Sequence, residues 1–322
     1  MDLEAILALT YDDRQAVDRE INRRLKSDVA LINQLAGYII HSGGKRLRPL
    51  IVLLASGACG YQGQDHIPLA TIVEFIHTAT LLHDDVVDAS ELRRGQTTAN
   101  VVWGNEASVL VGDFLYSRAF EMMVDVRNMR VMEILSKATN TIAEGEVMQL
   151  LNCHEPDIAE QQYLYVIRSK TAKLFEAAAR LGAVISQRDL AIETALAAYG
   201  MHLGTAFQLI DDVLDYRADP VTLGKNIGDD LAEGKPTLPM IHALRTGNAR
   251  ERDLLRAAIR EGGLEQIDAV VAAIESTGAI AYTARQAEDE AGRARKALAV
   301  IPDSPHAQAL LDLAHYSVHR NH

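Results

Sequence analysis

Two clusters of aspartates end two apolar, helix-forming stretches of this chain. The pentapeptide Asp-Asp-Val-Val-Asp at Asp84–Asp88 returns as Asp-Asp-Val-Leu-Asp at Asp211–Asp215. The first and last aspartates of each pentapeptide lie on one helix face, one turn apart. Three carboxylates on one turn repel one another, so a purely structural helix gains nothing from them. Hard cations such as Mg²⁺ bind carboxylates together with substrate phosphates. The pattern therefore predicts two facing clusters that hold one polyanionic substrate through divalent cations.

Apolar residues recur with the period of an α-helix along most of the chain, and no convincing series of alternating strands is seen. Polar loops are expected at residues 91–98 and 219–236. The predicted helices cover residues 12–40 (one helix or a pair), a segment with Pro49 in its first turn that ends near Gly57, and residues 68–88, 105–125, 129–151, 161–182, 189–216, 237–246 and 250–261. No proline-rich linker divides the chain. We therefore expect one all-α domain over residues 1–322, a helical bundle around a central cavity.

Charge and cysteine content exclude several classes of protein. The formal net charge of −12 and the lack of a basic face argue against nucleic acid as a partner. The two cysteines, Cys59 and Cys153, do not form a disulfide framework, which favours a reducing cytoplasm. The N-terminus carries acids where an export signal needs basic residues, and the longest apolar run is too short for a transmembrane segment. We expect a cytoplasmic protein, with peripheral membrane contact left open.

Each acidic cluster shares its helix face with a further polar side chain. His77 precedes Asp84 by about two turns and falls on the same face as the acids. A lone histidine is more often a core residue, but this alignment favours a functional one. Gln208 shares a face with Asp211 and Asp215, surrounded by apolar residues. This pattern favours a polar stripe that faces a cavity, and the alternative is a polar face exposed to solvent.

Basic residues near glycines suggest a phosphate site. Gly43-Gly44 precedes Lys45 and Arg48, which are three residues apart where a helix opens. Glycines allow close backbone approach, and a helix N-terminus with Arg and Lys can bind a diphosphate. A solubilising surface cluster is the alternative. Arg93 and Arg94 follow the first acidic cluster and could either neutralise it or complete a phosphate clamp. Further polar residues that would not count on their own are Lys170, Thr171, Lys225 and Lys235.

Taken together and in order, these motifs resemble the trans-type polyprenyl diphosphate synthases. The resemblance covers residues 43 to about 239 and includes GGKRLRP, LLHDDVVDxxxxRRG, GxxFQxxDDxxD and GDDLAEGKPTLP. A single DDxxD would be weak, whereas the whole series is highly specific. The resemblance implies an all-α fold and a homodimer with one deep cavity per subunit. It further implies condensation of isopentenyl diphosphate onto an allylic diphosphate.

The resemblance also implies a role for each matching residue. The aspartates would bind about two to three Mg²⁺ ions; these are Asp84, Asp85, Asp88, Asp211, Asp212 and Asp215. The allylic diphosphate would contact Arg93, Lys170, Thr171, Gln208, Lys225 and Lys235. Isopentenyl diphosphate would contact Lys45, Arg48, His77 and Arg94 without a metal. Catalysis would depend mainly on Asp84, Asp85, Asp88, Arg93, Lys170, Asp211 and Asp212.

Residues ahead of the first acidic cluster bear on product length. Ala79 and Thr80 are small where, by resemblance, short-chain enzymes place bulky aromatics that close the cavity. A small residue leaves the tunnel open for a long product. Met122 or Met123 on a neighbouring helix could form a deeper floor, because methionine fills irregular space. We expect Ala79→Tyr to shorten the product while sparing turnover.

The leading interpretation is a long-chain synthase that extends farnesyl diphosphate to roughly C40 for a quinone side chain. A short-chain geranylgeranyl diphosphate synthase has the same chemistry and stays open. A terpene cyclase would share the first aspartate motif but would not need Lys45 and Arg48, because it takes no second diphosphate. A non-catalytic subunit of a hetero-oligomeric synthase would be expected to lack some of these acids or bases, and none is missing.

Overall fold

The computed structural model describes residues 1–217, 228–262 and 264–320. Nearly all regular structure in these residues is helical, which confirms the all-α prediction. Their strands form a single two-residue antiparallel pair, β1 (Leu92–Arg93) and β2 (Gln96–Thr97). This pair lies inside the segment expected to be a polar loop, because two residues per strand are too few for alternation to show.

The described residues pack into two compact units, each assembled from separate stretches of the chain. The first unit comprises Met1–Thr139, Leu174–Gly200 and Ala297–Leu313. The second unit comprises Asn140–Lys173, Met201–Lys296 and Ala314–His322. The single domain expected from the sequence stays a prediction, and each unit is described by itself below.

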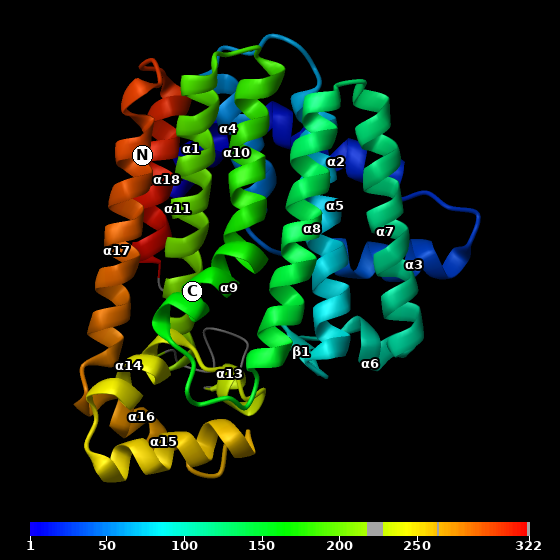
Figure 1. Ribbon diagram of the computed structural model, residues 1–322. Helices are drawn as coiled ribbons and strands as arrows, with labels where there is room; N and C mark the ends of the chain where they lie inside the picture. Colours follow the sequence, from blue (N-terminus) through cyan, green and yellow to red (C-terminus); the bar gives the residue numbers. More distant parts are fainter. Residues whose placement is uncertain (218–227, 263, 321–322) are drawn as a thin grey trace. The chain divides into compact units, whose positions relative to one another are not determined.

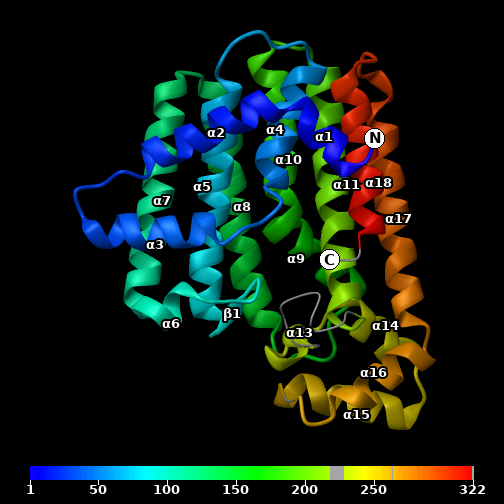
Figure 2. The ribbon, with the colours of Figure 1, turned by 180° about the vertical axis from the view of Figure 1, so that it is seen from behind.

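The first unit is built around two long apolar helices. Its helices are α1 (Leu3–Leu9), α2 (Tyr11–Arg24), α3 (Ala30–His41), α4 (Leu47–Ala58), α5 (His66–Val87), α6 (Ala99–Trp103), α7 (Asn105–Val126), most of α10 (Lys173–Ile185) and the 3₁₀ turn η2 (Leu298–Val300). Helices α5 and α7 lie side by side in both views (Figures 1 and 2), and α2 and α4 also contact α5. Helix α5 is therefore buried on most of its surface, as its nearly continuous apolar sequence requires.

The second unit gathers shorter helices. It holds α9 (Glu160–Ile167), the π-helical turn η1 (Arg168–Ala172), α13 (Asp229–Ala232), α14 (Leu238–Thr246), α15 (Ala249–Glu261), α16 (Ile267–Ser276) and α17 (Ala279–Ala297). Helices α14, α15 and α16 pack together (Figure 1) around Met240, Leu255 and Ile274. Helix α15 begins with a capping box in which the Asn248 side chain and Glu251 bond to each other's backbone.

Three long helices contribute residues to both units: α8 (Met129–Asn152), α11 (Leu190–Asp215) and α18 (Pro305–His319). The range expected to be one helix over residues 161–182 is divided into α9, η1 and α10. Helices α1 and α6 were not predicted, because short helices carry little periodic signal. The pair of helices in residues 12–40 and the segment with Pro49 near its start are confirmed as α2, α3 and α4.

In the described part of the chain, no single helix is long and apolar enough to cross a membrane. The segments Ile267–Ser276 and Ala279–Val300 are bent by 65° relative to each other. Only when taken as a pair are they long and apolar enough to cross a membrane.

Candidate active site

The first acidic cluster closes α5. Asp88 is the C-cap residue of α5, and its N–H donates to the carbonyl of Asp84 at 2.8 Å. Asp85 is fully buried, and Arg93 donates to its Oδ1 through Nε at 2.8 Å and Nη2 at 2.6 Å. Burial raises the pKa of Asp85, and the charge of Arg93 opposes that shift. Among the described residues, Asp85 Oδ2 has no hydrogen-bond partner. Asp85 is thus held by Arg93 inside the first unit.

Arg48 and His77 also lie in the first unit and contact each other. Arg48 Nη1 is 3.0 Å from His77 Nε2, and the Arg48 guanidinium lies 4.5 Å from the centre of the Phe175 ring. Burial, followed by the positive charges of Arg48, Arg94 and Arg93, holds the pKa of His77 well below its usual range. His77 is therefore neutral at physiological pH and acts as a hydrogen-bonding group.

The glycine pair ahead of α4 makes room for Arg94. Gly44 has φ +125°, and a Cβ there would lie 2.5 Å from Arg94 Nη1. The same Nη1 donates to the carbonyl of Gly43. Only glycine allows this backbone conformation and this close approach. The sequence related the glycines to close approach of a diphosphate. In the structure the group that approaches them is the Arg94 side chain, and binding of a diphosphate here stays a prediction. Lys45 follows directly in the chain and is half-buried.

A buried acid beside these arginines was not predicted. Glu74 lies on α5, one turn before His77, and its Oε1 is 3.9 Å from Arg46 Nε. Burial raises the pKa of Glu74, while the charges of Arg46, Arg48 and Arg94 oppose the shift. A glutamate within a long apolar run was the available sequence signal, because a buried acid needs a partner. Glu74 balances part of the positive charge gathered at this site.

The second acidic cluster closes α11. Asp212 is almost completely buried, and Gln208 Nε2 donates to its Oδ1 at 3.0 Å. The Tyr163 hydroxyl donates to its Oδ2. Burial, then the charge of Asp230, raises the pKa of Asp212 to about 8, although Tyr163 and Gln208 act in the opposite direction. Tyr163 was not predicted, because nothing in the sequence around residue 163 relates it to α11.

Asp211 is held differently. Arg320 donates to Asp211 Oδ1 through Nη2, and also to the carbonyl of Phe207 at 3.0 Å. Its guanidinium stacks over the Phe207 ring at 3.8 Å. The sequence did not identify Arg320, because it lies 109 residues from Asp211. The structure thus adds a cation from the end of the chain to this motif.

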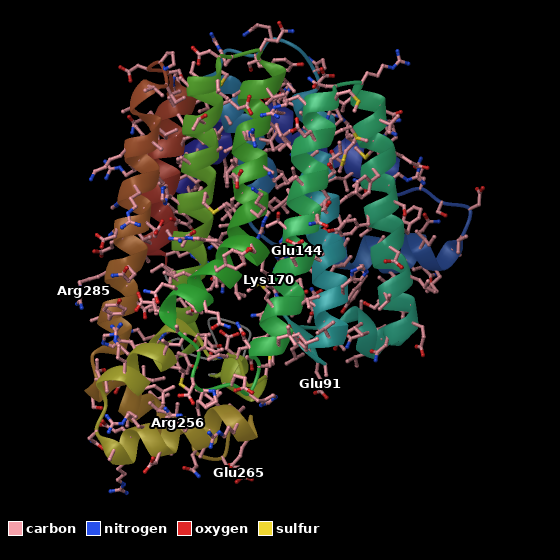
Figure 3. All side chains as sticks on the ribbon, viewed as in Figure 1. Glu91, Glu144, Lys170, Arg256, Glu265 and Arg285 are labelled. Atoms are coloured by element: carbon pink, nitrogen blue, oxygen red, sulfur yellow. The ribbon has the colours of Figure 1, made fainter. Side chains whose placement is uncertain are left out.

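Lys170 and Thr171 project from η1, a turn in which the helix widens. Lys170 Nζ lies 2.6 Å from Glu146 Oε2 and 2.6 Å from Gln149 Oε1. Figure 3 shows Lys170 next to α8. The two backbones are close there, because a Cβ on Gly145 would lie 2.8 Å from the backbone nitrogen of Lys170. Thr171 Oγ1 donates to Gln208 Oε1 at 3.0 Å. Such π-turns are frequent at functional sites, and this one brings two predicted residues to α11 and α8.

Of the two predicted lysines after the second cluster, the structure describes one. Lys235 is buried, forms an ion pair with Glu233 at 2.5 Å, and its N–H donates to the carbonyl of Asp230 at 2.8 Å. Lys225 lies outside the described residues. Lys235 belongs to the second unit, together with Asp211, Asp212 and Asp215.

The residues predicted to set product length lie within the first unit. Ala79 on α5 and both Met122 and Met123 on α7 are fully buried. Thr80 Oγ1 donates to the carbonyl of His77 at 2.8 Å. Because α5 and α7 pack together, these side chains lie on neighbouring elements. That they line a tunnel for the growing chain stays a prediction.

The aspartates fit a hard divalent cation. Both clusters sit at helix C-termini, where the helix dipole disfavours negative charge by about 0.3–1 kcal/mol per group, so a cation there would be stabilising. No group of three or more His, Cys, Asp or Glu in the described residues surrounds a single metal position. Mg²⁺ does not require one, because it usually binds one or two carboxylates together with substrate phosphates and water. The donor set is therefore compatible with Mg²⁺ carried by a diphosphate.

The raised pKa of Asp212 predicts proton release when a cation binds. Because burial raises the pKa of Asp212 to about 8, this carboxyl binds a proton more readily in the metal-free protein than an ordinary aspartate does. A divalent cation beside the motif favours the ionised form, so Mg²⁺ with pyrophosphate should release protons and bind more weakly as pH falls. Calorimetry in buffers of different ionisation enthalpy measures the release, and Asp212→Asn should reduce it. A heat independent of buffer would contradict this.

The same shift sets a pH dependence of stability. The folded-state pKa of Asp212 lies above its ordinary value of 3.8, so the folded protein holds a proton that the unfolded chain has lost. This contribution to the free energy of unfolding is present at low pH and decreases as pH rises from about 4 to about 8. Thermal unfolding of the metal-free protein across that window, compared with Asp212→Asn, measures it.

This chain is similar to known proteins along its whole length. The polyprenyl synthetase family model matches residues 29–276. The chain is 52% identical over 322 residues to octaprenyl diphosphate synthase of Escherichia coli (strain K12), covering all of both chains. It is 46% identical over 316 residues to all-trans-nonaprenyl-diphosphate synthase (geranyl-diphosphate specific) of Rhodobacter capsulatus, covering 98% of this chain and 97% of that protein. It is also similar to a crystal structure of polyprenyl synthase from Caulobacter crescentus CB15 complexed with calcium and isoprenyl diphosphate, with 46% identity, a TM-score of 0.96, and coverage of 99% of this chain and 98% of that one.

Proposed function

Because this chain belongs to the polyprenyl synthetase family, we propose that it is a long-chain prenyltransferase. It would add isopentenyl diphosphate units to an allylic diphosphate, with farnesyl diphosphate as the primer. The observation that carries the proposal is that each acidic cluster closes an apolar helix beside a cation: Arg93 in the first unit and Arg320 in the second. Carboxylates and cations in close proximity suit a substrate that arrives as a metal-bound diphosphate.

Two sets of basic and polar residues would each bind one of the two diphosphate substrates. Lys45, Arg48, Arg94 and the neutral His77 would bind isopentenyl diphosphate through charge and hydrogen bonds. Lys170, Lys235 and Arg93 would stabilise the negative charge that grows on the leaving pyrophosphate as the allylic carbon–oxygen bond breaks. The isopentenyl double bond then attacks the allylic carbon, and loss of a proton to the departing pyrophosphate restores an alkene. Each cycle would lengthen the chain by five carbons.

Mg²⁺ would be held by the aspartates of the two motifs, and its chemistry there would be to neutralise the diphosphate and assist its departure. Asp85 and Asp212 differ from the other four aspartates in being buried. Arg93 donates to Asp85, and Gln208 and Tyr163 donate to Asp212, so these bonds would fix the orientation of two of the carboxylates that hold the cation. The calcium in the structure from Caulobacter crescentus supports dependence on a divalent cation.

We expect a product of roughly C40, which would supply the side chain of a quinone. Support comes from full-length identity of 52% to an octaprenyl diphosphate synthase and from the small residue Ala79. Purified protein with farnesyl diphosphate, labelled isopentenyl diphosphate and Mg²⁺ tests the proposal through the chain lengths extracted. Products that end at C15 or C20 would favour the short-chain alternative, and absence of any product would favour a non-catalytic subunit.

Ala79→Tyr tests the control of product length. The complete burial of Ala79 means that a tyrosine must displace packed neighbours, at a cost of about 1–3 kcal/mol. We expect shorter products and a lower midpoint of thermal unfolding, so turnover is compared at a temperature where the variant is folded. Unchanged product length in a folded variant would remove Ala79 from the explanation.

A homodimer is proposed from the resemblance and from exposed apolar side chains on α6 and α7. Val102, Val109, Leu110 and Val124 expose 49%, 37%, 67% and 61% of their surfaces. Large apolar side chains exposed on neighbouring helices favour an interaction surface, and light scattering measures the oligomeric state. Cys59 and Cys153 are not joined in a disulfide, which favours the proposed reducing, cytoplasmic location. Release of a long apolar product would bring the enzyme to a membrane surface.

A further inference from the structure

Tyr163 connects α9 to the second acidic cluster. Its side chain is buried, and its hydroxyl donates to Asp212 Oδ2. Gln208 Nε2 donates to the other oxygen, Oδ1, at 3.0 Å. Both oxygens of this carboxylate therefore accept hydrogen bonds from side chains of the second unit, and rotation of Asp212 would break one or both of them.

The contacts extend from Asp212 to the turn that carries Lys170. Gln208 bonds to Asp212 through Nε2, and its side-chain oxygen Oε1 accepts a hydrogen bond from Thr171 Oγ1 at 3.0 Å. Four side chains from three elements thus form one chain: Tyr163 from α9, Asp212 and Gln208 from α11, and Thr171 from η1. An amide can make such a link, because it donates through nitrogen while it accepts through oxygen.

The tyrosine is itself fixed by packing. Its ring belongs to an apolar cluster with Ile167, Leu209, Ile210 and Leu238. A buried ring in a packed cluster has few accessible rotamers, so the hydroxyl is presented in one direction. The hydroxyl is the donor in the hydrogen bond to Asp212 Oδ2.

We propose that Tyr163 is a positioning residue of the second aspartate motif. Its hydroxyl sets the orientation of the Asp212 carboxylate, and through Gln208 it sets the orientation of the Thr171 hydroxyl. This inference rests on the proposed function, in which Thr171 and Gln208 contact the allylic diphosphate. Tyr163 itself touches neither substrate. It acts through the hydrogen-bonded side chains of Asp212, Gln208 and Thr171.

Tyr163→Phe removes the hydroxyl and keeps the ring in its cluster. Tyr165→Phe is the matched control, because Tyr165 lies on the same helix and is 54% exposed. For Tyr163→Phe we expect kcat/KM for the allylic diphosphate to fall about 10- to 100-fold, the range for loss of a hydrogen bond to a charged group. KM for isopentenyl diphosphate should stay within about twofold of wild type, because its predicted ligands belong to the first unit. Tyr165→Phe should match wild type.

Binding without turnover provides the second measurement. The affinity for inorganic pyrophosphate in the presence of Mg²⁺, measured by calorimetry, should fall in Tyr163→Phe and not in Tyr165→Phe. This measurement needs no product, so it separates failure of the inference from failure of the proposed function. A wild-type protein that forms no polyprenyl product would overturn the proposed function, whereas a lower pyrophosphate affinity in Tyr163→Phe would still support positioning by Tyr163.

Two outcomes would overturn the inference. One is a lower midpoint of thermal unfolding in Tyr163→Phe with unchanged kcat/KM and pyrophosphate affinity, which would make the hydroxyl purely structural. The other comes from the double variant Tyr163→Phe/Thr171→Val. If the four side chains act as one chain, its loss of kcat/KM should be smaller than the product of the two single losses. Fully multiplicative losses would show that the two hydroxyls act independently.

Discussion

Lys170→Ala is expected to lower kcat by about 10²–10³-fold, the range for removal of one preorganised donor from a developing anion. In the proposed reaction the ammonium group of Lys170 stabilises charge on the leaving pyrophosphate, and this charge is greatest after the bond begins to break. The loss should therefore appear in kcat more than in KM. Single-turnover measurements with the allylic diphosphate would isolate this chemical step.

The fold should tolerate this change. Lys170 is paired with Glu146 and Gln149, and Glu146 exposes 28% of its side chain, so water can solvate the carboxylate that remains. Lys137→Ala is the control, because Lys137 is an exposed lysine on α8. Its kcat should equal that of wild type. A Lys170→Ala enzyme with normal kcat would show that the leaving group is stabilised elsewhere.

Arg93→Ala is expected to cause the largest loss of stability. It removes both hydrogen bonds to Asp85 Oδ1 and leaves a carboxylate that is fully buried. Removing one partner of a buried ion pair costs about 3–5 kcal/mol. The lower end applies here, because Arg93 exposes 21% of its side chain. Chemical denaturation measures the free energy of unfolding, and a denaturation midpoint equal to that of wild type would contradict this account.

A second substitution and a pH series show whether Arg93→Ala loses stability because the buried charge of Asp85 is left unpaired or because packing is lost. Asp85→Asn added to Arg93→Ala removes the buried charge, so the double variant should be more stable than Arg93→Ala alone. Burial already raises the pKa of Asp85, and loss of Arg93 should raise it further. The folded state of Arg93→Ala would then take up a proton as pH falls, and the difference from wild type should shrink towards acidic pH. A difference independent of pH would point to lost packing instead.

Arg93 and Lys170 illustrate a feature common to the candidate site. Three of the basic side chains expected to bind phosphate are already paired with acids: Arg93 with Asp85, Lys170 with Glu146, and Lys235 with Glu233. When a diphosphate binds, each of these basic side chains would therefore exchange a carboxylate partner for a phosphate oxygen. Such an exchange costs less than the desolvation of an isolated cation, and it keeps each side chain oriented before substrate binds.

The helical fold and both acidic clusters could be predicted from the sequence. Helical periodicity is a local property, and α5 and α11 end at their aspartate motifs as the apolar runs before them indicated. The expectation of a phosphate site beside the glycines was also local in origin, since Gly43, Gly44 and Lys45 are adjacent. Here residue type and spacing alone carry the physical information, because each motif lies within a few helical turns.

Distant partners could be identified only in the folded structure. Tyr163 reaches Asp212, Arg320 reaches Asp211, and Glu74 lies among the arginines. The six aspartates look equivalent in sequence, yet folding buries Asp85 and Asp212 and leaves the others to different surroundings. Burial and hydrogen bonding depend on which elements pack together, so only the folded structure shows which carboxylates are buried and which side chains donate to them. The sequence by itself placed carboxylates at two helix ends, because residue type and spacing are local, whereas tertiary packing decided the surroundings of each one.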